Sequence, residues 1–212
     1  MKKYLTEFIG TFFLVLTVGL CVIGGTKFAP LAIGSALMIM VYMGGHVSGG
    51  HYNPAVSLAA MMRGALDGKE LIPYWVSQIL GAIVAAVVVY LIVGSTFAPA
   101  PGAQASTLGA LLIEFLFTFA LCLVVLNSAT AKGTEGNSFY GLAIGFTVMV
   151  GAFSGGDISG GAFNPAVGIG PVLINATMGD GGFGNLWLYL VGPLLGGAVA
   201  AVVFKIQNPG DD

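Results

Sequence analysis

The sequence carries the stretch GGHYNPAVSLAA at residues 49–60 and a near-copy, GGAFNPAVGIGP, at residues 160–171. Both copies contain the tripeptide Asn-Pro-Ala, which is formed by Asn53, Pro54 and Ala55 and again by Asn164, Pro165 and Ala166. Proline suits the first turn of a helix, where its missing N–H has no partner anyway, and Asn directly before it is a favoured N-cap. Each copy is therefore predicted to begin a helix inside otherwise apolar sequence.

The composition predicts a membrane protein. Hydrophobic residues make up 57% of the 212 residues and charged residues only 8%. Because a soluble domain ordinarily carries about 25% charged residues, we expect the outer surface of this protein to face a lipid bilayer. The net charge of −2 and the absence of a basic cluster argue against a nucleic-acid partner. No residue spacing indicates a metal site or a cofactor, so we expect neither.

Six segments have the length and apolar character of membrane-crossing helices, which need about 20 residues. They span roughly residues 4–25, 29–46, 72–94, 108–130, 139–155 and 186–206. The apolar stretch after each Asn-Pro-Ala, about ten residues, is too short to cross a bilayer but long enough for a re-entrant half-helix. The prediction is an all-α membrane protein with six transmembrane helices and two re-entrant half-helices, forming a single transmembrane domain over residues 1–212.

The basic residues predict the orientation. An even number of spans places both termini on one side, and cytoplasmic loops carry an excess of Lys and Arg. With the termini in the cytoplasm, the cytoplasmic basic residues are Lys2, Lys3, Arg63, Lys69, Lys132 and Lys205. Only Lys27 is then outside, so we expect a multi-pass protein with both termini cytoplasmic.

The chain contains an internal duplication. The stretch TEFIGTFFLVL (6–16) matches IEFLFTFALCL (113–123), and VSQILGAIVAAVV (76–88) matches VGPLLGGAVAAVV (191–203), with the two Asn-Pro-Ala stretches between them. Repeat one covers about residues 1–95 and repeat two about 107–212. Because each repeat holds three spans, the second is inverted, and the two half-helices should meet near the membrane midplane.

This meeting point has the chemistry of a pore for neutral solutes. Each half-helix presents a partial positive charge of about +0.5 at its N-terminus, which repels cations and protons, while the Asn amides donate hydrogen bonds. The glycine-rich runs before the tripeptides are predicted to be extended, which membrane-embedded backbone tolerates where it lines a watery cavity. The expected pore-lining backbone comprises Gly49, Gly50, His51, Tyr52, Gly160, Ala162 and Phe163.

These features together resemble the aquaporin (major intrinsic protein) family. The similarity covers nearly the whole chain and includes both SGGxxNPAV segments, Glu7, Glu114 and GPLLGGA at 192–198. It implies an hourglass-shaped bundle in a cell or inner membrane, usually a homotetramer with one pore per subunit. It also implies that Glu7 and Glu114 support the re-entrant loops by holding their backbone N–H groups.

The resemblance also assigns a selectivity filter. Water-selective members carry an aromatic residue, a His and an Arg at their narrowest constriction. Counting from each motif, the equivalent positions here are Ile33, Ala152, Gly161 and Val167. Such a filter should be wider and less polar, and it resembles that of plant vacuolar members with broad permeability. We therefore expect passage of water and of solutes such as ammonia, urea and hydrogen peroxide, with protons and ions excluded.

Two alternatives stay open at this point. One is a glycerol-type facilitator of the same family, although glycerol-selective members typically follow the second motif with Arg-Asp, where this chain has Val167-Gly168. The other is a secondary transporter, a class that also uses inverted repeats and broken helices. An intramembrane enzyme would need a nucleophile and a base at membrane depth. The spans offer no such pair, so we expect no enzymatic activity.

Overall fold

The computed structural model describes residues 1–211, and every regular element in this range is helical. The α-helices are α1 (Lys2–Ile23), α2 (Ala29–Ser48), α3 (Pro54–Arg63), α4 (Leu71–Val93), α5 (Thr107–Val125), α6 (Tyr140–Ser159), α7 (Pro165–Met178) and α8 (Leu188–Gln207). Short 3-10 turns lie at η1 (Gly68–Glu70) and η3 (Lys132–Thr134), and α5 ends in a π-helical turn, η2 (Leu126–Thr130).

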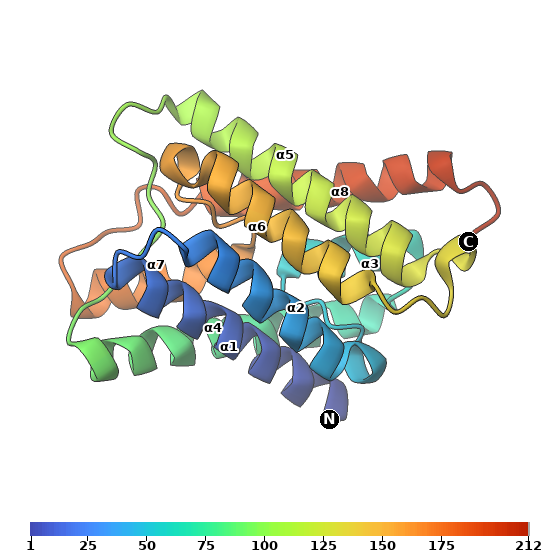
Figure 1. Ribbon diagram of the computed structural model, residues 1–212, viewed down its shortest axis with the longest axis horizontal. Coiled ribbons are helices and arrows are strands. Elements are labelled where there is room, and N and C mark those ends of the chain that lie inside the picture. Colours follow the sequence, from blue (N-terminus) through green and yellow to red (C-terminus); the bar gives the residue numbers. More distant parts are fainter. Residues whose placement is uncertain (212) are drawn as a thin grey trace.

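Six of these helices are long and apolar enough to cross a membrane, namely α1, α2, α4, α5, α6 and α8. The helices α3 and α7 have 10 and 14 residues, which gives them lengths of only ~15 and ~21 Å. They run in from opposite ends of the bundle (Figure 1). The predicted fold of six spanning helices and two half-helices is confirmed.

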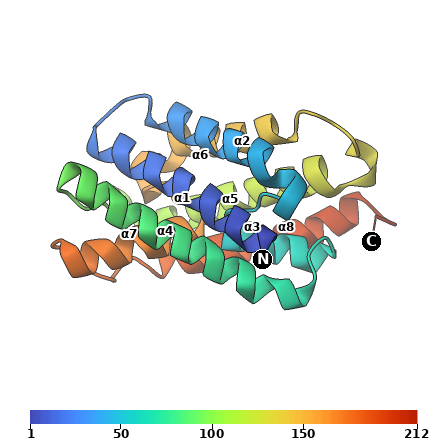
Figure 2. The same cartoon turned by 90° about the horizontal axis from the view of Figure 1, so that it is seen from below.

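The two halves of the chain interlock through their half-helices. Helix α1 packs on α4 and α5 packs on α8, whereas α3 packs on α8 and α7 on α4 (Figure 2). Each half-helix therefore lies against the last spanning helix of the other half. Glycines allow the close helix pairs: a Cβ atom on Gly81 would lie 2.5 Å from the Phe8 carbonyl oxygen, and one on Gly196 would lie 2.6 Å from that of Phe115.

Two spanning helices are longer than the sequence predicted. Helix α2 continues from residue 46 to Ser48, and α6 continues from residue 155 to Ser159. Both end at a glycine, Gly49 or Gly160, with a φ angle of +90°. This left-handed conformation is a common helix terminator that only glycine adopts without strain. The non-helical stretch before each Asn-Pro-Ala is therefore shorter than expected, although its position is as predicted.

The flanks of the bundle are apolar. Large side chains such as Leu91, Ile92, Leu108 and Ile206 are 61–74% exposed. Exposed apolar surface of this extent needs a nonpolar environment, and with six apolar helices it identifies an integral, multi-pass membrane protein. The N-terminus and the end of α8 lie at the same end of the bundle (Figure 1), which we call the terminal face.

Candidate pore at the junction of the half-helices

The N-termini of α3 and α7 meet inside the bundle and are joined by their two cap residues. Asn53 and Asn164 each accept a backbone N–H bond of 2.9 Å from the residue two positions on, which is the cap that the sequence predicts. The Asn53 amide donates to the Phe163 carbonyl oxygen and the Asn164 amide to that of Tyr52, both at 2.9 Å. Because an amide nitrogen carries two N–H groups, each can also present one N–H to the cavity that both side chains line.

The residues that precede the caps have strained backbones. Tyr52 and Phe163 have φ angles of +50° and +48°, a conformation that costs about 1–3 kcal/mol for a bulky residue. Their N–H groups donate 2.7 Å bonds to the carboxylates of Glu7 and Glu114, respectively. These strained conformations are therefore stabilised by hydrogen bonds to glutamate oxygens, and the carbonyl of each residue is bonded to the Asn of the opposite half.

Glu7 and Glu114 are fully buried and anchor the loop of their own half. Oε1 of Glu7 accepts bonds from the Ser48 hydroxyl at 2.6 Å and the His51 N–H at 3.0 Å. Oε1 of Glu114 accepts the equivalent bonds from Ser159 at 2.7 Å and the Ala162 N–H at 3.0 Å. Both carboxylates thereby satisfy backbone donors that the extended loops leave without helical partners.

Sequence reasoning did not identify several polar side chains behind these loops. The Gln78 amide donates to Oε2 of Glu7 at 2.8 Å and to the Ser57 hydroxyl at 2.9 Å. The hydroxyls of Tyr74 and Tyr189 donate to the carbonyls that end α2 and α6, at 2.7 and 2.6 Å. Two signals were available: Gln78 is a polar residue inside an apolar span, and Tyr74 and Tyr189 occupy equivalent repeat positions.

A cavity of about 640 Å³ runs from the junction toward the face opposite the terminal face. Its wall includes all four expected filter positions, Ile33, Ala152, Gly161 and Val167. All four are apolar. Asn53, Asn164 and His51 lie at the inner end of the cavity, and its wall also includes Thr26, Lys27 and Asp157.

The expected pore-lining backbone is only partly placed on a cavity wall. His51, Gly160, Ala162 and Phe163 line this cavity, and Gly49 lines a second one. Gly50 and Tyr52 are buried instead. The Tyr52 ring packs closely on Gly10, and its hydroxyl donates to the Met40 carbonyl oxygen at 2.8 Å. Tyr52 therefore anchors the loop to α1 and α2 and offers only its carbonyl to the junction.

The segment between the two halves adds wall residues that sequence reasoning missed. Residues 97–100 (Phe97, Ala98, Pro99, Ala100) line the same cavity as the filter positions. The segment is docked on the end of α6: the Gly102 N–H donates to the Ile158 carbonyl oxygen at 3.1 Å. A Cβ atom on Gly160 would lie 2.7 Å from the Ala100 nitrogen. No motif marks this segment in the sequence.

A second cavity, of about 1080 Å³, opens at the terminal face. We call it the vestibule. His51 and Val125 line both the vestibule and the first cavity, so the two adjoin beside the junction. Within residues 1–211, no three His, Cys, Asp or Glu side chains gather where they could hold a metal ion.

Two half-helices that meet inside a six-helix bundle, with a cavity on each side of their junction, define a channel-type membrane protein. The chain belongs to the Major intrinsic protein family, whose sequence profile matches residues 1–204. It is therefore an aquaporin- or aquaglyceroporin-type channel.

Individual relatives carry both kinds of name. Aquaporin NIP1-4 of Oryza sativa subsp. japonica is 36% identical over 225 residues, covering 100% of this chain and 79% of the relative. Glycerol uptake facilitator protein-like 6 of Lactiplantibacillus plantarum is 35% identical over 226 residues, covering 100% of both chains. The X-ray structure of the aquaglyceroporin from Plasmodium falciparum superposes with a TM-score of 0.88 at 24% identity, covering 100% of this chain and 98% of the other. This last similarity concerns the fold alone.

Proposed function

We propose that this chain forms a passive pore for water and for small neutral solutes such as ammonia, urea and hydrogen peroxide, and that it excludes protons and ions. The observation that carries the proposal is the junction, where two helix N-termini face each other and Asn53 and Asn164 line the cavity. The paired positive helix ends oppose a passing cation, while the amide N–H groups serve a neutral solute.

The breadth of the proposed selectivity rests on the filter. Ile33, Ala152, Gly161 and Val167 line the cavity without contributing a side-chain donor or a fixed charge. A constriction of this kind discriminates by size more than by hydrogen bonding. Its similarity to the filters of broad-permeability plant vacuolar members remains part of this proposal.

The orientation and assembly are proposed from the sequence. The terminal face would be cytoplasmic, because the excess of Lys and Arg lies at that face, at helix ends and in the connecting segments. We further propose that residues 1–95 and 107–212 are the two repeats of one pore domain, and that the channel is a homotetramer in a cell or inner membrane.

Glycerol facilitation is a second candidate within the same class. The relative from Lactiplantibacillus plantarum carries that name and matches over its whole length. The apolar filter is also compatible with glycerol, because the carbon backbone of glycerol can contact apolar side chains. Typical glycerol-selective members have an Arg after the second motif, and this chain does not. The permeability to glycerol must therefore be measured together with that to urea.

Stopped-flow light scattering on proteoliposomes tests these proposals. Wild-type protein should raise the fluxes of water and urea above those of protein-free vesicles, while an internal pH dye reports no added proton flux. Replacing Val167 by Arg places a guanidinium in the filter and should lower urea and glycerol flux about tenfold, with water flux largely retained.

Val167→Leu is the matched control, because it adds bulk without charge or donors. If the leucine variant excluded urea as strongly as the arginine variant, size alone would set the selectivity. Wild-type vesicles that conduct water but no urea or glycerol would refute the broad filter. A proton flux above that of protein-free vesicles would refute the proposed barrier at the junction.

A further inference from the structure

His51 lines both the vestibule and the first cavity, and its ring is hydrogen-bonded to a buried polar neighbour. Its side chain is 8% exposed, whereas Ser57 and Gln78 behind it are fully buried. Nδ1 of His51 lies 3.0 Å from the Ser57 hydroxyl oxygen, and that oxygen lies 2.9 Å from the Gln78 amide nitrogen. The three side chains therefore form a short hydrogen-bonded chain that leads from the cavity wall into the protein.

The direction of these hydrogen bonds is set at the buried end of the chain, by Glu7. Oε2 of Glu7 accepts the Tyr52 N–H at 2.7 Å and lies 2.8 Å from the Gln78 amide nitrogen. The reversed amide would place two oxygen acceptors in contact at this point, so the amide nitrogen of Gln78 must face Glu7. An amide nitrogen carries two N–H groups, and Gln78 donates one to Glu7 and the other to Ser57. The Ser57 oxygen is therefore the acceptor in its bond with Gln78.

The Ser57 hydroxyl has one proton to donate, and His51 supplies the acceptor. Among the described residues, the Ser57 oxygen has two hydrogen-bond partners, the Gln78 amide nitrogen and Nδ1 of His51. If Nδ1 carried a proton, the Ser57 hydroxyl would be a buried donor without an acceptor, which is energetically unfavourable. Ser57 therefore donates to an unprotonated Nδ1. It follows that the His51 ring is neutral and carries its proton on Nε2.

The other ring nitrogen, Nε2, is open to a cavity. It makes no hydrogen bond among the described residues, and it does not belong to the buried side-chain atoms that lack a partner. A Cβ atom on Gly49, which lines the vestibule, would lie 2.9 Å from Nε2. The ring packs on Tyr74, with 5.3 Å between the ring centres, and the His51 backbone N–H is held by Glu7 at 3.0 Å. His51 thus presents one oriented N–H donor where the vestibule adjoins the junction.

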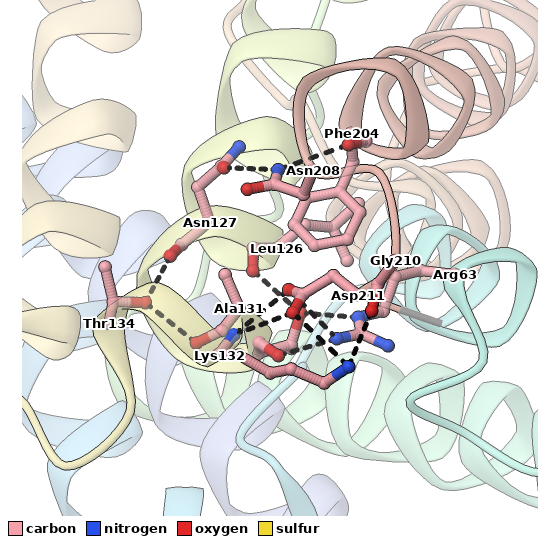
Figure 3. A network of polar contacts seen from close by, with 11 residues as sticks. Arg63, Leu126, Asn127, Ala131, Lys132, Thr134, Phe204, Asn208, Gly210 and Asp211 are labelled. Atoms are coloured by element: carbon pink, nitrogen blue, oxygen red, sulfur yellow. Dashed lines mark hydrogen bonds and ion pairs between the residues drawn. The ribbon is translucent and has the colours of Figure 1, made fainter.

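Two cationic side chains of the vestibule wall, Arg63 and Lys132, are bonded to the protein instead (Figure 3). Nη2 of Arg63 donates to the Thr130 carbonyl oxygen at 2.8 Å and lies 3.6 Å from Oδ2 of Asp211. The Lys132 ammonium donates to the Gly210 carbonyl oxygen at 2.7 Å. These donors already have acceptors, whereas Nε2 beside the junction has none among the described residues.

We propose that Ser57, oriented by Gln78, is a positioning residue that holds the His51 ring neutral with its proton on Nε2. The ring then offers a fixed donor to the oxygen of a passing neutral solute, beside the two Asn amides of the junction. The use of this donor by a solute rests on the proposed channel function, whereas the state of the ring does not.

Solid-state NMR of the full chain in lipid at neutral pH, with isotope-labelled histidine, tests the state of the ring. Protonated and unprotonated ring nitrogens resonate far apart, and the carbon atoms bonded to each nitrogen identify it as Nδ1 or Nε2. The chain has two histidines, so His46→Gln leaves the signals of His51 alone. His46 is exposed, and its replacement leaves Ser57 and Gln78 in place. We expect an unprotonated Nδ1 and a protonated Nε2.

Substitutions of Ser57 in the same background test whether this residue selects the ring form. Ser57→Ala removes the donor to Nδ1, so we expect signals of both neutral ring forms. Ser57→Thr keeps the hydroxyl and should keep the original spectrum. Ser77→Ala is the matched control, because the Ser77 hydroxyl donates to the Pro73 carbonyl oxygen of its own helix at 2.8 Å. Its loss should leave the His51 signals unchanged.

Gln78→Glu reverses the chain, because a carboxylate oxygen accepts the Ser57 proton and frees the Ser57 oxygen to accept from Nδ1. The proton of the ring should then move from Nε2 to Nδ1. Should this variant not fold beside Glu7, the two Ser57 variants still decide the assignment.

Water flux in proteoliposomes tests the use of the donor. In Ser57→Ala, part of the population turns an unprotonated Nε2 toward the vestibule, so we expect the flux to fall about twofold. Ser57→Thr and Ser77→Ala should conduct water as the wild type does.

A protonated Nδ1 in the His46→Gln background would overturn the assignment of the ring form. An unchanged spectrum for Ser57→Ala, or an equal change for Ser77→Ala, would overturn the role of Ser57. A changed spectrum for Ser57→Ala with unchanged water flux would overturn the use of the donor by the solute. If wild-type protein conducts no water, the proposed channel function fails by itself, and the spectra still decide the state of His51.

Discussion

The two loops that carry the Asn caps, residues 48–53 and 159–164, have the same frame but different surroundings. In each loop a serine and two backbone N–H groups bond a buried glutamate, an aromatic residue has a positive φ angle, and the Asn amide crosses to the other loop. The strained conformation and its glutamate acceptor therefore occur as a pair. This pairing is what the duplicated sequence preserves.

The surroundings differ in polarity. Around the first loop, His51 Nδ1 lies 3.0 Å from the Ser57 hydroxyl, which in turn accepts a bond from Gln78. The equivalent positions of the second repeat are Ala162, Gly168 and Pro193. The first loop therefore has polar neighbours at positions where the second loop has apolar ones. The two roles are therefore separate. The hydrogen bonds shared by both loops form the junction, whereas the neighbouring residues determine how polar the surroundings of each loop are.

The largest effect should come from replacing one carboxyl oxygen of each glutamate by an amide group, which cannot accept the same hydrogen bonds. Glu7 accepts bonds from Ser48, Gln78 and the N–H groups of His51 and Tyr52, whereas Glu114 accepts the equivalent bonds without any from a glutamine. Each buried donor left unpaired costs about 1–3 kcal/mol. We expect Glu7→Gln to lower the unfolding temperature in detergent more than Glu114→Gln, and both to lower it clearly.

Thr118→Val is the control for this comparison. Thr118 is fully buried on α5, four residues after Glu114, and its hydroxyl has no partner among the described residues. Its replacement should therefore change stability by less than about 1 kcal/mol. A loss for Glu114→Gln that equals or exceeds that for Glu7→Gln would show that the polar surroundings of the first loop add nothing to the frame.

The difference between features that both repeats share and features that occur only once explains what could be predicted from the sequence. The caps, the six spans and the repeated glutamates follow from local patterns or from the duplication, because equivalent residues in an inverted repeat must face the same junction. The docking of residues 97–100 on α6 and the contact between Arg63 and Asp211 follow no repeat and no local pattern. They depend on how the loops close the ends of the bundle, which only the assembled structure shows.

A smaller effect should follow from narrowing the apolar side of the pore at Ala100. This residue lines the cavity together with the filter positions. Ala100→Phe should lower glycerol or urea flux about threefold with less effect on water, because bulk in an apolar constriction discriminates by size. Ala103→Phe, in the same segment but exposed and outside the cavity wall, is the control and should leave both fluxes unchanged. Equal fluxes for wild type and Ala100→Phe would exclude the segment from the selectivity of the pore.

The smallest effect should come from making the first loop more like the second at Gln78, whose repeat equivalent is Pro193. The Gln78 amide nitrogen bonds Glu7 and Ser57, but its carbonyl oxygen is buried with no partner among the described residues. Gln78→Leu loses two bonds and also removes that unpaired oxygen, so we expect a net loss of only about 1 kcal/mol in thermal unfolding. Gln78→Glu should be much worse, because it places a second carboxylate beside Glu7. If Gln78→Leu were instead as damaging as Glu7→Gln, the first loop would depend on its polar surroundings for its fold, and the two halves would differ in their frame as well as in their polarity.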